Sequence, residues 1–293
     1  MEENKIFGLS GFSLKVIACI LMTLDHVALL FIAQGVGEYN TAYYILRAIG
    51  KISFPIFCFL AVEGAYHSKD VRFYLLRLGT MAVFLDCFGY AFGLINNISI
   101  ATNPLIGNAF TDLFMGVLMI YLLRMRNGYS ILALIPIFYE IFSDFNLGND
   151  YGTIFKSDWG TFSIVLFLFF FLAREFMSFY LRRKAINSHL DENCFLLNPG
   201  RSYQIASAIA LFFVEACFYL IYRIAGDVFI LPNEFVPIGT YSTFAFLFIL
   251  LYNGKRGYDN KIIKYSFYAY YPLHLIILGI LSMFFGVLSN STL

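Results

Sequence analysis

Several acidic, basic and histidine side chains fall inside long apolar stretches of this chain, where they could carry chemistry. Ionisable groups are costly in the core of a lipid bilayer, so they face the interior of a helix bundle, pair with one another or act on a substrate. Histidine can take up and release a proton near neutral pH, as a general base must. The residues of this kind are Asp25, His26, Arg47, Lys51, Asp86, Asp112, Glu140, Glu215 and His274.

The elements that must position these residues are apolar helices. Of the 293 residues, 60% are hydrophobic and 13% are charged, whereas soluble domains carry roughly 25% charged residues. A bilayer core about 30 Å thick needs about 20 apolar residues in helical conformation. The stretches that qualify or nearly qualify are 12–33, 42–65, 74–96, 109–124, 129–145, 159–180, 203–225, 236–252 and 265–288. We therefore predict an all-α transmembrane bundle of about nine helices, forming one domain over 1–293.

The basic residues give this bundle a direction. Cytoplasmic loops of membrane proteins are enriched in lysine and arginine. With the N-terminus in the cytoplasm, sixteen of the 20 basic residues fall in or beside inner segments, Lys156 falls outside, and Arg47, Lys51 and Arg223 fall within helices. The longest inner segment is predicted as a polar loop over 181–202. The pattern predicts a cytoplasmic N-terminus, an extracytoplasmic C-terminus and full crossing by the short stretches 109–124, 129–145 and 236–252.

These directions give each buried ionisable group a depth. At 1.5 Å per residue, His26 lies about 20 Å from the inner end of its helix, and Arg47 and Lys51 lie about 7–13 Å below the outer surface. Asp86 and His274 come near the midplane, so His26, Lys51, Asp86 and His274 share one layer. Two interpretations stay open. The charged groups form ion pairs between helices, such as Asp25 or Asp86 with Arg47 or Lys51, or they form a reaction centre.

Prolines and aromatic residues lie beside these positions. Pro55 follows the Arg47–Lys51 pair and Pro272 precedes His274 by two residues. Proline bends a helix and frees a carbonyl group, which fits either a water-accessible cavity or simple helix packing. The aromatic run over 265–271 is interpreted as an interfacial belt with helix packing. The five cysteines are scattered without metal-ligand spacing, and no metal site is predicted.

At several of these positions the sequence resembles the TraX family, whose founding activity is N-terminal acetylation of a conjugative pilin. The stretches that carry the resemblance are Gly8-Leu-Ser-Gly-Phe-Ser-Leu-Lys15, Leu21-Met-Thr-Leu-Asp-His26, Arg47-Ala-Ile-Gly-Lys-Ile-Ser-Phe-Pro-Ile-Phe57 through Glu63-Gly64, Tyr74-Leu-Leu-Arg77, Asn108-Ala-Phe-Thr111, Leu251-Tyr-Asn-Gly-Lys-Arg-Gly257 and Tyr271-Pro-Leu-His-Leu275. They run in order along almost the whole chain. The chain departs from the family pattern at Lys51, where arginine is expected, and around Asp86, where an expected proline is missing.

The resemblance implies a membrane-bound acyltransferase of the bacterial inner membrane that uses acetyl-CoA as donor and no metal. It implies His26 as general base, with Asp25 and His274 as further catalytic candidates. Arg47 and Lys51 are candidates for stabilising an oxyanion, and Lys255 and Arg256 for binding the phosphates of acyl-CoA. Asp86, Glu63 and Thr111 are secondary candidates for the site.

Two other functions stay open at this point. The same intramembrane acids and histidines could relay protons in a proton-coupled transporter, although no internal repeat relates the halves of the chain. The chain could also be a non-catalytic membrane component of a conjugation apparatus. The net charge of +1 gives no sign of a nucleic-acid partner. For an enzyme, the acceptor is expected to be a peptide amine or an envelope glycan, and the sequence does not identify it.

Overall fold

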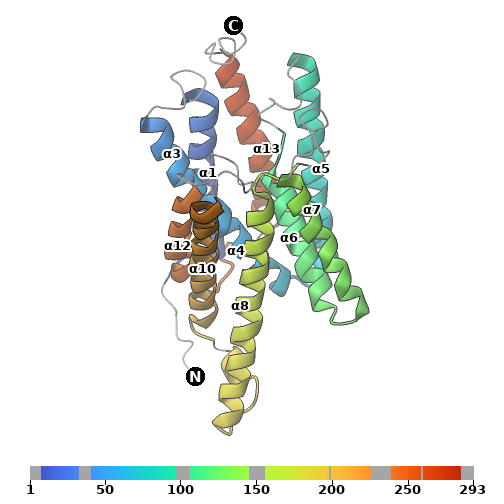
Figure 1. The fold of residues 1–293 in the computed structure, drawn as a ribbon, viewed down its shortest axis with the longest axis vertical. Helices are drawn as coiled ribbons and strands as arrows, with labels where there is room; N and C mark the ends of the chain where they lie inside the picture. Colours follow the sequence, from blue (N-terminus) through green and yellow to red (C-terminus); the bar gives the residue numbers. More distant parts are fainter. Residues whose placement is uncertain are drawn as a thin grey trace. The chain divides into compact units, whose positions relative to one another are not determined.

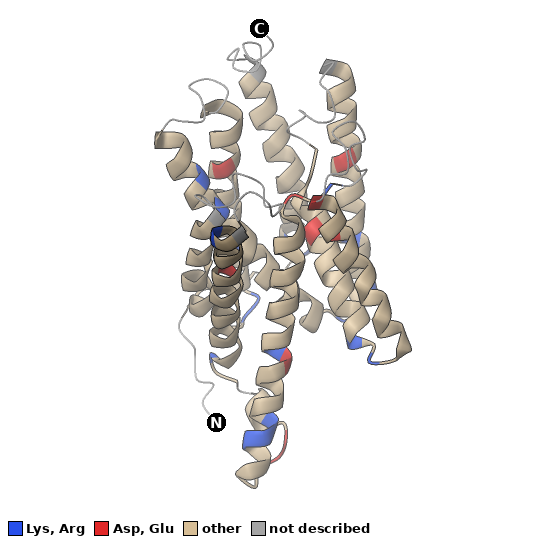
Figure 2. Cartoon of the chain, in the orientation of Figure 1, with Lys and Arg blue, Asp and Glu red and all other residues tan. Residues whose placement is uncertain are grey.

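The computed structural model describes residues 8–32, 41–96, 106–144, 156–197, 199–225, 239–258 and 260–284. Within them the chain is helical, and its one β-type contact is a parallel bridge between Leu9 and Tyr252. This confirms the all-α prediction. Figure 2 shows how sparsely charged residues occur along these helices. Five helices are long and apolar enough to cross a membrane: Gly11–Ile32, Thr41–His67, Val71–Ile95, Gly160–Asn187 and Ser202–Ile224.

The chain folds into two compact units. Unit 1 comprises Met1–Phe57, Gly200–Ala208 and Pro232–Leu293, and unit 2 comprises Cys58–Pro199 and Ile209–Leu231. The predictions of a single domain, of nine crossings and of the side on which each end lies stay predictions. The predicted helix ends at 33, 145 and 285–288, and residues 236–238, lie outside the described residues.

Unit 1 contains α1 (Gly11–Val27), which continues as a π-helix (Ala28–Ile32), α3 (Thr41–Lys51), a 3₁₀ turn (Gly239–Phe244), α12 (Ala245–Leu251) and α13 (Lys261–Phe284). Helix α1 packs against both α3 and α13, as Figure 1 shows. Gly50 permits the close approach of α3, because a Cβ there would lie 2.3 Å from the Cβ of Asp25. The predicted span 42–65 is interrupted at Ile52, so Pro55 lies in the first turn of α4 (Ser53–His67), where a missing N–H is tolerated.

The start of α1 is held by the segment that follows α12. Leu9 N–H donates to the Leu251 carbonyl, Asn253 N–H donates back to Leu9, and Gly11 N–H donates to the Lys255 carbonyl. Leu9 and Tyr252 form the parallel bridge, and Ser10 caps the helix by accepting from Ser13 N–H. Two stretches that carry the family resemblance, 8–15 and 251–257, therefore form one structural feature.

Gly257 gives a test of this feature. Its φ of +77° lies in the left-handed region, and a Cβ would lie 2.5 Å from Ser10 Oγ. Replacing Gly257 by alanine is expected to lower the free energy of unfolding by about 1–3 kcal/mol. Gly254→Ala is the matched control, since its φ is +75° but nothing lies within 4 Å of a Cβ. Denaturant titration in detergent should show the smaller loss for Gly254→Ala, and equal losses would contradict the contact with Ser10.

Unit 2 contains α5 (Val71–Asn96), α6 (Ala109–Arg124), a 3₁₀ turn (Gly128–Ala133), α7 (Leu134–Asp144), α8 (Gly160–Asn187) and α9 (Cys194–Leu197), together with most of α4 and of α10 (Ser202–Ala225). Helix α6 packs against α5, α7 and α8. Gly116 lets α6 approach α8, because a Cβ would lie 2.3 Å from the ring of Phe167. The stretch predicted at 129–145 begins as 3₁₀ and has only eleven residues of α-helix.

The predicted loop over 181–202 is wrong in its first part. Helix α8 continues to Asn187, and the short α9 packs back against it. Leu181 and Ala185, four residues apart on one helical face, are buried. The many charged side chains of this segment suggested a loop. They surround the narrow apolar face of Leu181 and Ala185, whose burial stabilises the helix.

Candidate active site

The two histidines predicted as catalytic candidates meet in unit 1. His26 lies one residue before the end of α1, and His274 lies in the middle of α13. The Nδ1 atom of His26 and the Nε2 atom of His274 are 2.9 Å apart, which is a hydrogen bond. His274 is buried with 6% of its surface exposed, and His26 is half-buried. A π-helical turn follows immediately after Val27, and such turns recur at functional sites.

The direction of this hydrogen bond follows from a second contact. His274 Nδ1 lies 2.9 Å from the backbone carbonyl of Tyr270, which can only accept. In a neutral His274 the proton is therefore on Nδ1, and Nε2 is an acceptor. The hydrogen bond between the rings must then be donated by His26 Nδ1–H. The Nε2 atom of neutral His26 consequently carries a lone pair, so it can accept a proton.

Aromatic residues of α13 hold this pair in place. The Tyr270 ring stacks on His274 with centroids 5.2 Å apart, and Tyr271 makes edge contacts with both imidazole rings. Thr23 Oγ1 donates to the Cys19 carbonyl and so accepts from the Tyr270 hydroxyl at 2.6 Å. The sequence interpretation of 265–271 as an interfacial belt missed these roles. A signal was present, because residues three and four before a helical histidine share its face.

Asp25 and Arg47 form a buried ion pair in the same unit. Arg47 Nη1 donates to Asp25 Oδ2 at 2.6 Å, and the two side chains are 7% and 14% exposed. This was one of the pairings that the sequence left open. Lys51, half-buried, ends α3, and the charges of Asp25, Arg47 and Lys51 all act on the His26 ring. The structure thus brings together five predicted site residues: Asp25, His26, Arg47, Lys51 and His274.

Lys255 and Arg256 lie in the segment bound to the start of α1. Their side chains are exposed, while their carbonyl groups accept from the backbone N–H groups of Gly11 and Phe12. They are thus fixed at the first turn of α1. The helical rise places His26, fifteen residues farther along, about 22 Å away.

Three secondary candidates lie in unit 2. Asp86 accepts a hydrogen bond from Asn108 Nδ2 at 2.9 Å, and Asn108 Oδ1 caps α6 by accepting from Thr111 N–H. Glu63 forms an ion pair with Arg174 and lies 3.7 Å from His67 Nδ1. Asp86 belongs to unit 2 and His26 to unit 1, so the layer that they were predicted to share stays a prediction.

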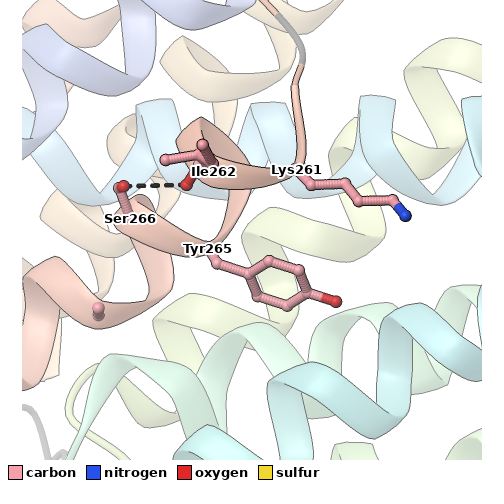
Figure 3. A pocket seen from close by; sticks show the side chains of 5 residues that line it. Lys261, Ile262, Tyr265 and Ser266 are labelled. Atoms are coloured by element: carbon pink, nitrogen blue, oxygen red, sulfur yellow. Dashed lines mark hydrogen bonds between the residues drawn. The ribbon is translucent and has the colours of Figure 1, made fainter.

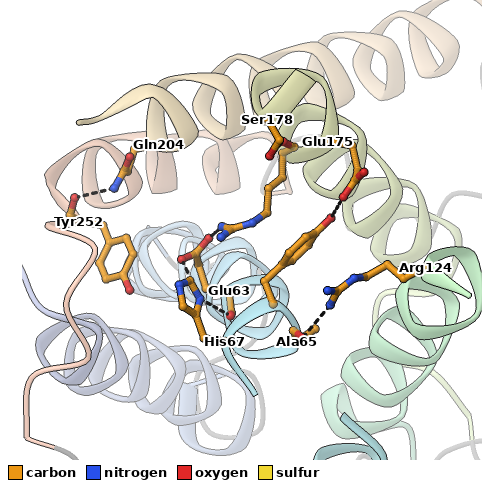
Figure 4. A network of polar contacts seen from close by, with 10 residues as sticks. Glu63, Ala65, His67, Arg124, Glu175, Ser178, Gln204 and Tyr252 are labelled. Atoms are coloured by element: carbon orange, nitrogen blue, oxygen red, sulfur yellow. Dashed lines mark hydrogen bonds and ion pairs between the residues drawn. The ribbon is translucent and has the colours of Figure 1, made fainter. Parts of the chain in front are cut away.

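Figure 4 shows the polar network that contains Glu63 in unit 2. The Tyr66 ring lies between two guanidinium groups, those of Arg124 and Arg174, each 4.3 Å from its centroid. The Tyr66 hydroxyl donates to Glu175 at 2.7 Å, and Arg124 donates to the Ala65 carbonyl. These contacts tie α4, α6 and α8 together, so the arrangement of Glu63 is explained by ion pairing between helices.

A surface depression on α13 does not coincide with the histidines. It is lined by Lys261, Ile262, Tyr265, Ser266 and Ala269, all from one helix (Figure 3). Ile262 and Tyr265 are exposed. Ser266 Oγ donates to the Ile262 carbonyl, so its hydroxyl proton is already hydrogen-bonded within the helix. In the described part of the chain, no group of three or more His, Cys, Asp or Glu side chains could hold a metal ion.

Comparison with known proteins places this chain in a family. The family described as TraX protein matches residues 10–282. A protein from Dichelobacter nodosus described as "Probable fimbrial assembly protein FimC, serogroup H1" is 27% identical over 289 residues, covering 97% of this chain and 99% of that protein. No solved structure is significantly similar.

Proposed function

The chain belongs to the TraX family, and from that premise we propose that it is an acyltransferase of the cytoplasmic membrane. In this proposal it moves an acyl group, acetyl by the family resemblance, from acyl-CoA to an amine or hydroxyl acceptor. The observation that carries the proposal is the directed hydrogen bond between His26 and His274. It leaves an accepting nitrogen on His26 among buried charges in a multi-pass membrane protein.

His26 Nε2 would act as the general base. As the acceptor nitrogen or oxygen attacks the thioester carbonyl, its proton passes to Nε2 and a tetrahedral oxyanion forms. The oxyanion then collapses, the carbon–sulfur bond breaks, and the CoA thiolate takes the proton from His26. His274 would not be the base. It would accept a hydrogen bond from His26 Nδ1–H, which keeps the His26 ring in the reactive tautomer and stabilises the imidazolium that forms.

The charges around His26 suit this reaction. Arg47 and Lys51 place positive charge near the ring, and such charge stabilises an oxyanion in a site from which water is excluded. Asp25 binds Arg47 and fixes its guanidinium. The pair keeps the positive charge of Arg47 in place without leaving it uncompensated in the bilayer.

The exposed side chains of Lys255 and Arg256 are the proposed contact for the phosphates of acyl-CoA. Their backbone is fixed on the first turn of α1, which is predicted from the distribution of basic residues to lie on the cytoplasmic side. Along the same helix, His26 would lie farther into the membrane. The pantetheine arm of the donor would extend along α1 from the basic segment toward the histidines.

The proposed acceptor is a peptide amine or an envelope glycan. The name of the Dichelobacter nodosus protein refers to fimbrial assembly, which favours a fimbrial or pilin-like peptide as the first acceptor to test.

Thermal stability of the purified protein separates this proposal from its alternatives. Acetyl-CoA should raise Tm, whereas acetate and CoA fragments should not. A Lys255→Ala, Arg256→Ala variant should need a higher acetyl-CoA concentration for the same rise. Proton-driven uptake without any effect of acetyl-CoA would instead favour a transporter. The absence of both effects would favour a non-catalytic membrane component.

His274 offers a sharper test of the site. His274→Ala removes the acceptor for His26 Nδ1–H and should lower the acylation rate about 100-fold. His274→Asn can still offer a carbonyl oxygen to the same hydrogen, and it should recover part of the rate. A merely structural His274 would give variants whose rates follow their thermal stability. Rates of the two variants should therefore be compared at matched folded fractions.

A further inference from the structure

Unit 2 holds a second buried polar cluster that plays no part in the proposed transfer. The Asp112 cluster consists of Asp112 on α6, Glu140 and Ser143 on α7, and Ser157, which precedes α8. These four residues are between 0% and 6% exposed. Three separate segments therefore bring two carboxyl and two hydroxyl groups into the interior of one unit.

Asp112 accepts several hydrogen bonds that stabilise its negative charge. Its carboxylate accepts the Ser157 hydroxyl at 2.5 Å and the backbone N–H groups of Asp158 and Gly160 at 3.0 and 3.1 Å. These amides open the 28-residue helix α8, whose N-terminus carries a partial positive charge. Asp112 thus caps α8 from a neighbouring helix, and its negative charge is compensated.

Glu140 has no such compensation. It is 0% exposed, and within the described residues neither carboxylate oxygen accepts a hydrogen bond; the Ser157 hydroxyl, which interacts with Glu140, donates its proton to Asp112. Glu140 and Ser143 are three residues apart on α7 and so share a face. Ser143 Oγ accepts the Ser157 N–H at 3.0 Å, which directs that face toward Ser157 and Asp112. The charges of Glu140 and Asp112 interact. A buried carboxyl group in this position takes up either a proton or a counter-charge.

We propose that the Asp112 cluster binds a monovalent metal cation of the sodium type. The ligands would be oxygens of Glu140, Asp112, Ser143 and Ser157, the ligand type that hard cations prefer. The C-terminal end of α7, with its partial negative charge, lies at the same place. One charge is enough, because Asp112 is already compensated by α8. The other charged or titratable groups described around the cluster are Asp144, which accepts from Thr161 N–H, Asp158, Lys156, Tyr139 and Cys58.

The test is the sodium dependence of Tm for the full chain in detergent. Sodium chloride is varied from about 1 to about 300 mM against N-methylglucamine chloride, so that ionic strength is constant. A cation that binds the folded chain should raise Tm by a few degrees and then saturate. Glu140→Gln should remove this rise. Glu215→Gln, the same change at another buried acid of unit 2, should keep it.

The outcomes separate the cation from simple protonation. A saturable sodium effect that is lost only in Glu140→Gln supports the site. A Tm that depends on pH through Glu140 but not on sodium means that the carboxyl is merely protonated, and it overturns the proposal, as does a Tm that responds to neither. A His26→Ala variant should keep the full sodium effect, so that failure of the acyltransferase proposal and failure of the cation site are distinguishable.

Discussion

Replacing His26 by alanine is expected to lower the rate of acyl transfer by about 10²–10⁴-fold, the usual contribution of a general base. The reason is the direction of the hydrogen bonds around the two histidines. The Tyr270 carbonyl fixes the proton of His274 on Nδ1, and His274 Nε2 then fixes the proton of His26 on its Nδ1. Only Nε2 of His26 is left to accept a proton. The measurement is acetyl-CoA-dependent release of CoA thiol in membrane vesicles that contain the envelope acceptors.

The control for this prediction is another histidine of the same chain. His189 is exposed in the turn after α8, in unit 2, and its backbone N–H donates to the Ile186 carbonyl. His189→Ala should therefore keep the rate of the unmodified protein. His26→Ala should reach the membrane in normal amounts, because its ring is only half-buried. An unchanged rate of acyl transfer by a well-expressed His26→Ala chain would contradict the assignment of His26 as the general base.

Breaking the Asp25–Arg47 pair is expected to have the largest effect on stability. Arg47→Met leaves the Asp25 carboxylate buried beside α3 without its partner. Removing one member of a buried ion pair typically costs about 3–5 kcal/mol, because the remaining charge is uncompensated. The 2.6 Å contact and the low exposure of both side chains place this pair in that class. Unfolding of the purified protein by denaturing detergent gives the free-energy difference.

Two further variants show whether the charge is the cause. The Asp25→Asn, Arg47→Met double variant also removes the uncompensated negative charge of Asp25, and it should recover most of the lost stability. Arg72→Met breaks an exposed pair with Asp70 and should change stability little, since exposed ion pairs contribute little. If the double variant were as unstable as Arg47→Met alone, the loss would come from packing around Gly50 rather than from charge.

The helices of this chain were predictable because their signal is local. Apolar stretches long enough for a bilayer predict α1, α5, α8 and α10. Their described ends agree with the structure within a few residues, except that α1 gives way to a π-helix after Val27 and α8 runs on to Asn187. The break at Ile52 was not predictable from hydropathy, because both sides of it are apolar. The 3₁₀ starts of the stretches 129–145 and 236–252 were missed for the same reason.

The candidate site was predictable in its members but not in its contacts. Buried charge is costly, so Asp25, His26, Arg47 and His274 stood out by type alone. Their pairing depends on how α1 packs against α3 and α13. This packing is set by the small size of Gly50 and by the rings of the tyrosines on α13. Helical spacing puts Tyr270 and Tyr271 on the face of His274. It does not reveal that Tyr270 orients His274, because a tyrosine at a membrane boundary can have the same spacing.

The most direct test of the central claim is mass mapping of envelope peptides and glycans from a strain that lacks this chain. The account predicts that one acylated species disappears in the deletion strain, returns with the unmodified chain and does not return with His26→Ala at equal membrane abundance. Identical acylation with and without the chain, or full restoration by His26→Ala, would contradict it.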